Sequence, residues 1–189
     1  MRWYRQAAAA GDPQAQFFLG LRYEQGLDGG PPNLEEAVAW FRRAAEQGYG
    51  PAQFKLGTAY QFSQGVAADD TQARRWYQAA AEQGMPSAQF NLAYMLEAGL
   101  GGPRDVGLAV RWYEWAAKGG IAEAFINLGL ILARGDGIEP DPVEALKWFE
   151  VAARRGVAGA EGLRDALAAQ LPPTQVAEAR SRALNWQPR

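Results

Sequence analysis

The sequence predicts an all-α protein built from tandem repeats, in which each repeat is a pair of antiparallel helices. Three observations predict this class: a period of 36 residues, apolar stripes with helical spacing inside each period, and helix-bounding residues at fixed places in it. The chain has 189 residues, which is long enough to bury a sizeable hydrophobic core.

A tryptophan followed by a second aromatic residue marks the period. Alanine stands four positions after every such tryptophan, glycine eight positions after it and another alanine twelve positions after it. The spacings between the tryptophans are 37, 36, 36 and 36 residues, for Trp3, Trp40, Trp76, Trp112 and Trp148. A leucine follows sixteen positions after the first four, whereas the fifth copy has Arg164. One such unit cannot bury its apolar surface alone, so the units are expected to stack.

Each unit is expected to hold two helices. In the first of them Ala15, Leu19 and Tyr23 lie four apart on one face, and Gly26 ends the helix. A loop follows, and the second helix begins at an asparagine or aspartate whose side chain can accept from unpaired N–H groups of the first turn. These residues stand seven positions before a tryptophan: Asn33, Asp69, Asp105 and Asp141. Small residues such as Gly20 and Ala44 are expected to let the two helices approach closely.

Together these columns resemble a known family. The blocks are W-[YF]-x-x-A-A-x-x-G, A-x-x-x-L-[GA] and a G-x-G loop that leads to Asp-x-x-x-Ala, with Gly99 and Gly101 in one loop and Gly135 and Gly137 in another. Over about residues 1–160 they resemble the Sel-1-like repeat, a relative of the tetratricopeptide repeat. The resemblance implies a right-handed superhelical solenoid of about four repeats. It also implies binding of protein or peptide partners, as in adaptors and scaffolds.

The two ends depart from the pattern. Residues 1–156 are expected to form the solenoid with a truncated first repeat, and residues 157–189 a degenerate last repeat with a capping helix. Pro173 is expected near the start of that helix, with Val176, Ala179, Ala183 and Leu184 on one face. Because Met1 stands only two residues before Trp3, either the first helix is short or the chain is a piece of a longer protein.

Composition argues against most kinds of catalysis. There is no histidine and no cysteine, which removes the commonest general base, the Ser-His and Cys-His nucleophile pairs and thiolate metal sites. Acidic residues in the loops, such as Asp69 and Asp70, are expected to cap helices rather than bind calcium. We therefore expect no enzyme, no metal and no cofactor. A cell-wall-associated hydrolase or a β-lactam-binding protein is an alternative by analogy with secreted relatives, but those are rich in disulfides.

Charge and hydropathy restrict the partners and the compartment. The formal net charge of −2 predicts no nucleic-acid partner, and no apolar run is long enough for membrane insertion. We expect a monomer, cytoplasmic by default because no signal peptide is present, or periplasmic if the chain is a fragment. A protein or peptide partner is the expected ligand, and a regulatory domain cut from a larger protein is the alternative role.

By analogy with tetratricopeptide repeats, the first helix of each pair is expected to line a concave groove. Apolar contacts would give affinity there, and the amides of Asn91 and Asn127 would fix the register of a peptide. The predicted binding residues on these helices are Phe17, Leu21, Phe54, Thr58, Phe90, Asn91, Tyr94, Asn127 and Leu130. For the phenylalanines, packing between neighbouring first helices is the alternative. Trp115 is added because its repeat position holds no other aromatic residue, so it either covers a gap or contacts a partner.

Overall fold

The computed structural model describes residues 2–187; Met1, Pro188 and Arg189, at the outer ends of the two predicted segments, lie outside the described residues. Within that range the chain is all-helical, which confirms the predicted class. Eleven α-helices and one 3-10 helix follow one another: α1 (Arg2–Ala9), α2 (Pro13–Gln25), η1 (Leu27–Gly29), α3 (Leu34–Glu46), α4 (Gly50–Gln61), α5 (Asp70–Glu82), α6 (Pro86–Ala98), α7 (Val106–Lys118), α8 (Ala122–Arg134), α9 (Pro142–Arg154), α10 (Ala160–Ala168) and α11 (Pro173–Asn185).

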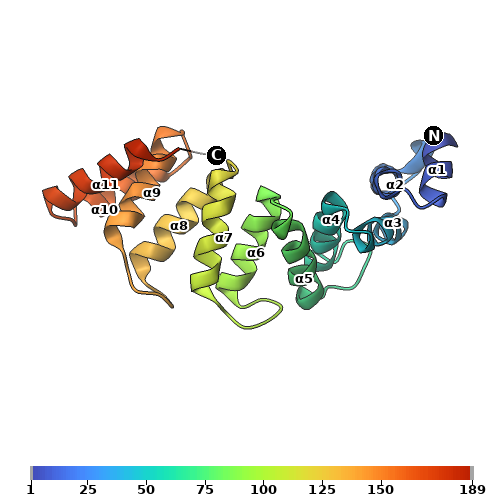
Figure 1. Cartoon of the computed structure of the whole chain (residues 1–189), viewed down its shortest axis with the longest axis horizontal. Helices are drawn as coiled ribbons and strands as arrows, with labels where there is room; N and C mark the ends of the chain where they lie inside the picture. Colours follow the sequence, from blue (N-terminus) through green and yellow to red (C-terminus); the bar gives the residue numbers. More distant parts are fainter. Residues whose placement is uncertain (1, 188–189) are drawn as a thin grey trace. The chain divides into compact units, whose positions relative to one another are not determined.

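The chain divides into two compact units. Unit 1 comprises the chain up to Ala88 together with Gly99–Pro103, and unit 2 comprises Gln89–Ala98 together with the chain from Arg104 onward. In unit 1 each of the helices α1 to α4 packs against the next one along the chain (Figure 1). In unit 2, α7 packs on α8 and α8 on α9, and α9 also contacts both α10 and α11.

The predicted caps begin the second helix of each pair. The side-chain oxygens of Asn33, Asp69, Asp105 and Asp141 each accept a hydrogen bond from the backbone N–H three residues further on, at 2.9–3.0 Å. Each bond satisfies one donor that the first helical turn leaves unpaired. The start of α3, α5, α7 and α9 is therefore fixed by a local interaction that the sequence shows directly.

The glycine after the repeat leucine allows the two helices of a pair to touch. A Cβ atom added at Gly20 would lie 2.6 Å from the ring of Phe41, one at Gly57 2.8 Å from Tyr77, and one at Gly129 2.3 Å from Phe149. The aromatic ring of the second helix thus lies directly on the backbone of the first. This confirms the close approach that the small residues predicted.

The repeat tryptophans join one pair to the next. Trp40 packs against a buried cluster that joins Ala8 of α1 to Ala15 and Leu19 of its own pair. Trp76 packs against a cluster that joins Ala44 and Ala45 of the preceding pair to Ala52 and Leu56 of its own pair. The apolar core therefore runs from pair to pair within unit 1, as expected for repeats that cannot bury their surface alone.

Glutamine side chains connect the two helices of each pair in unit 1 and also reach the preceding pair. The amide of Gln47 donates to the side-chain oxygen of Gln16 at 2.8 Å, and that of Gln83 donates to Gln53 at 2.7 Å. Gln16 and Gln53 are buried, and each also donates to a carbonyl oxygen of the preceding helix. In the α8–α9 pair of unit 2 the same two repeat positions hold Phe125 and Arg155. There a guanidinium 5.1 Å from a ring centroid replaces the amide pair.

The last helix, α11, is held on α9. Arg180 forms an ion pair with the buried Glu150 at 2.8 Å, and Arg182 pairs with Glu144 at 3.0 Å. Trp186, which directly follows α11, packs edge-on against Phe125 and Trp148, with centroid distances of 5.5 and 5.7 Å.

Two details predicted for the C-terminal capping helix have different outcomes. Pro173 occupies the first turn of α11, as predicted. The predicted apolar face was wrong for Leu184, which is 63% exposed, whereas Ala179 and Ala183 are buried. The buried face is centred on the two alanines, and Leu184 stands about 100° around the helix from Ala183.

Candidate functional site

The predicted phenylalanines lie within the helix pairs. Phe17 packs on Phe41, Phe54 on Tyr77 and Phe90 on Tyr113, with ring centroids 5.7, 5.8 and 5.4 Å apart. All three first-helix side chains are half-buried. Phe17 also contacts the ring of Phe18 and, at 5.3 Å, that of Tyr49 just before α4. These ring contacts give the three phenylalanines a packing role.

At the repeat position two residues after the leucine, the side chain is more exposed in one copy than in the others. Leu21, Thr58 and Leu130 are half-buried, but Tyr94 is 46% exposed. A large aromatic side chain that is exposed on a helix is available for a contact with another molecule. Tyr94 is therefore the most accessible of the binding residues predicted on the first helices.

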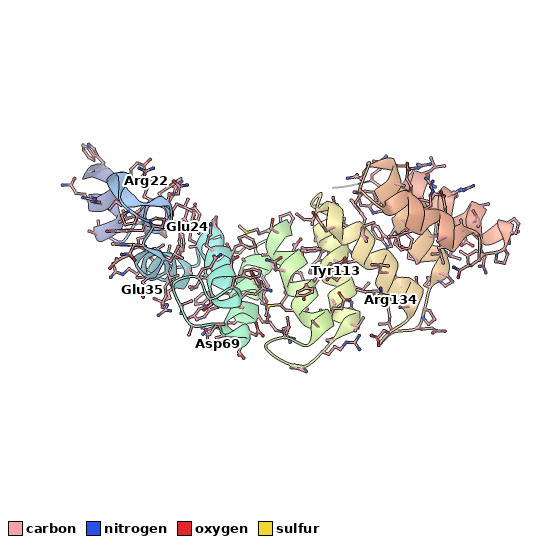
Figure 2. The ribbon with its side chains drawn as sticks, turned by 180° about the vertical axis from the view of Figure 1, so that it is seen from behind. Arg22, Glu24, Glu35, Asp69, Tyr113 and Arg134 are labelled. Carbon is pink, nitrogen blue, oxygen red and sulfur yellow. The ribbon has the colours of Figure 1, made fainter. Side chains whose placement is uncertain are left out.

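The Tyr113 hydroxyl joins three helices of unit 2 (Figure 2). It donates to the Glu97 carboxylate of α6 at 2.9 Å and accepts from the side-chain amide of Asn127 on α8 at 3.0 Å. Tyr94, also on α6, lies close enough to affect the ionisation of Tyr113. Glu97 and Asn127 thus bond one buried hydroxyl. Tyr94 lies one helical turn before Glu97 on α6, and the half-buried Asn91 lies on the same helix.

Unit 1 contains a counterpart of this junction. The Tyr77 hydroxyl lies 2.7 Å from the side-chain oxygen of Gln61 and 3.2 Å from the hydroxyl of Thr58. Gln61 and Thr58 occupy the repeat positions of Glu97 and Tyr94. The sequence did offer a signal for the junctions, since among the internal repeats this column holds tyrosine only at Tyr77 and Tyr113. The side chains that these hydroxyls would bond were not identified.

Burial raises the pKa of the Tyr113 hydroxyl far above its ordinary value of 10.0. The negative charge of Glu97 raises this pKa further, and the hydrogen bond from Asn127 acts in the opposite direction. The neutral phenol is therefore the form that the folded protein stabilises.

Alkaline pH is therefore expected to destabilise the chain through Tyr113. A pKa raised on folding contributes stability that is fully present below the unfolded value, about pH 10, and is lost as the pH rises above it. Urea unfolding at about pH 9 and about pH 11 should show a smaller loss for Tyr113→Phe than for the wild type. Tyr4→Phe, which removes a half-exposed tyrosine hydroxyl, is the control. Equal losses for Tyr113→Phe and the wild type would contradict the assignment.

Trp115 lies on the second-helix side of unit 2. It is 48% exposed and packs edge-on against the buried Trp112, with ring centroids 4.6 Å apart. The next residue back, Glu114, is half-buried, and its pKa is raised mainly by desolvation. Trp115 therefore covers Trp112 with one edge and keeps about half its surface in contact with solvent.

The groups gathered at the Tyr113 junction are polar and already hydrogen-bonded to one another. They are a neutral phenol, a carboxylate and an amide, and the phenol already donates to the carboxylate. Among the described residues no group of three acidic side chains is placed to hold a metal ion. No described helix is both long enough and apolar enough to cross a membrane.

The repeat pattern itself identifies the family. The sequence matches the Sel1 repeat over residues 1–12, 13–49, 50–85, 86–121 and 122–157. The chain belongs to the Sel1 repeat family. The bounds of the three middle matches coincide with the helix pairs α2–α3, α4–α5 and α6–α7, so one Sel1 repeat is one pair. The matched family is a structural repeat rather than a catalytic domain.

Two solved structures resemble this Sel1 repeat chain closely. One is a protective antigen present in uropathogenic Escherichia coli strains that displays an SLR fold, with 32% identity and a TM-score of 0.81. The match covers 96% of this chain but 39% of that one. The other is a Sel1 repeat protein from Oxalobacter formigenes, with 30% identity, a TM-score of 0.76 and coverage of 91% and 70%. No curated protein sequence matches the chain closely enough to count as a relative.

Proposed function

We propose that this Sel1 repeat chain is a non-catalytic adaptor or scaffold that binds a peptide or partner protein on its first helices. The observation that supports this most is the position of Tyr94, a 46% exposed tyrosine beside the Tyr113 junction. Exposed aromatic residues on rigid elements are frequent energetic centres of protein interfaces.

Asn127 supports the same surface. A side-chain amide has two N–H donors and an oxygen with two lone pairs, and the bond to Tyr113 uses one donor. That bond holds the amide in a fixed orientation. The remaining donor and the oxygen are the kind of groups that hold the backbone of an extended peptide.

The test is affinity capture with purified protein and quantitative mass spectrometry. Any specific partner of the wild type should be recovered roughly tenfold less, or worse, by Tyr94→Ala, and less by Asn127→Ala. Leu184→Ala removes another exposed apolar side chain of unit 2 and should retain the partner. Circular dichroism checks that the variants are folded. Equal recovery by wild type, Tyr94→Ala and Asn127→Ala would overturn the proposed surface.

A further inference from the structure

The outer face of α1 and α2 in unit 1 carries an apolar cavity of about 320 Å³. Its lining residues are Tyr4, Phe18, Leu19, Leu21, Arg22 and Gln25. Tyr4 is 52% exposed and Phe18 is 40% exposed. Exposed aromatic side chains that gather around a cavity are typical of a surface that binds another molecule.

The internal repeats bury the positions that are open here. Tyr4 corresponds to Phe41, Tyr77, Tyr113 and Phe149, all of which are at most 3% exposed. Arg22, which is exposed, corresponds to Ala59, Met95 and Ile131, which are buried. The α1–α2 face is therefore a repeat-packing surface that no described residue covers.

The internal copies also show what kind of group fits on such a ring. Phe41, Tyr77 and Phe149 are each covered by the backbone of a helix at a glycine, namely Gly20, Gly57 and Gly129. Because the ring would clash with a Cβ atom at each of these positions, a helix that covers Tyr4 in the same way needs a very small residue there.

The charges on this face indicate a second property of the helix that would cover it. Between first helices within unit 1, Lys55 of α4 pairs with Glu24 of α2 at 2.8 Å. The position of Lys55 corresponds to Phe18, and Arg22 lies one helical turn after Phe18. Arg22 and Glu24, both labelled in Figure 2, are two residues apart, so Arg22 points away from the side of α2 that faces Lys55. None of the described residues lining the cavity is a carboxylate.

We propose that the outer face of α1 and α2 binds an amphipathic α-helix of a partner protein, with a glycine over Tyr4 and a carboxylate beside Arg22. A second copy of the chain fits this face less well. Two copies meeting through it would bring the like charges of two Arg22 side chains together and set bulky rings against Tyr4. The helix α10 follows the last complete pair and stands at the place of a first helix. It has Arg164 and Asp165 at the positions where the repeats have leucine and a small residue.

The probe is a helix-stapled, fluorescent peptide with the sequence of α2, Pro13–Gln25, because this helix covers the corresponding face of α3. The staple is needed since an isolated helix of this length is marginal in water. Fluorescence anisotropy with the whole chain should show saturable binding. Gly20→Phe in the peptide should weaken binding tenfold or more, because its ring would collide with Tyr4.

A charge exchange tests the role of Arg22. Arg22→Glu in the protein should weaken binding of the peptide about threefold to fivefold, as expected for an exposed ion pair. Glu24→Lys in the peptide should restore it. Tyr94→Ala should leave binding unchanged, which separates this face from the surface proposed on unit 2. Because Arg22 is exposed, its replacement should not disturb the fold.

Three outcomes would overturn the proposal. They are no saturable binding of the α2 peptide, equal binding of its Gly20→Phe form, and no rescue of Arg22→Glu by the charge exchange. A fourth measurement is the oligomeric state of the whole chain by analytical ultracentrifugation. If the chain forms a concentration-dependent dimer that Phe18→Asp abolishes, the occupant of this face is a second copy of the chain and the proposed partner helix is wrong.

Discussion

Replacing Trp148 with alanine is expected to lower the free energy of unfolding by about 3–5 kcal/mol. Trp148 is 2% exposed and stacks on Phe125 with centroids 6.1 Å apart, while Trp186 packs on its edge at 5.7 Å. Removal of the indole would leave a cavity among α8, α9 and the end of the chain. The loss would be a large part of the stability of an ordinary domain.

Trp115 provides a matched control in the same unit. Because it is 48% exposed and contacts Trp112 with one edge, Trp115→Ala should cost about 1 kcal/mol, the usual size of an aromatic pair interaction. Urea unfolding followed by circular dichroism measures both variants. If the two substitutions cost the same, the assignment of Trp148 to the core and Trp115 to the surface is wrong.

Gly101→Ala is expected to be the second most damaging change, at about 2–4 kcal/mol. Gly101 has a φ of +67°, and an added Cβ would lie 2.1 Å from the backbone oxygen of Asp70 at the start of α5. A methyl group therefore meets both a strained backbone and a rigid neighbour. Gly65 makes the same close approach to Leu34 one repeat earlier. The second glycine of the loop is therefore required for the same steric reason in both repeats.

Gly84→Ala separates the two causes. Gly84 has a φ of +82° but no heavy atom near the position of an added Cβ. Its replacement should cost only the backbone strain, about 1–2 kcal/mol. Thermal unfolding of both variants gives the comparison. A loss for Gly101→Ala no larger than that for Gly84→Ala would mean that the loop moves away from α5 without cost.

The sequence was sufficient for most of the fold because the decisive signals are local or periodic. The caps at Asn33, Asp69, Asp105 and Asp141 act on N–H groups three residues away, so their effect can be recognised from a short segment. The Gly20 column recurs with the period, and only close packing explains a repeated glycine inside a helix. Leu184 was misplaced because a short helix with alanines at its centre leaves the direction of its buried face ambiguous.

The candidate site was predictable only in part. Tyr94 and Asn127 were identified as binding residues from the geometry of related repeats, and their binding remains a prediction. Their relation to Tyr113 was not foreseen, because Asn127 lies 14 residues and Glu97 16 residues from it along the chain. For Trp115 the sequence left two alternatives open, covering a gap or contacting a partner, because a lone aromatic residue outside the repeat pattern gives no hint of its exposure.

The sequence by itself therefore determined the repeat, its helix pairs, their start points and the glycines on which rings pack. Each of these depends on interactions within one turn of helix or on a column repeated several times. Only the tertiary structure decided which polar side chains meet: Tyr113 with Glu97 and Asn127, and Gln47 with Gln16. It also decided that the face of Tyr4 and Arg22 is open. Those outcomes depend on how helices far apart in sequence pack, because exposure and hydrogen bonding are properties of the assembled neighbours rather than of the residue.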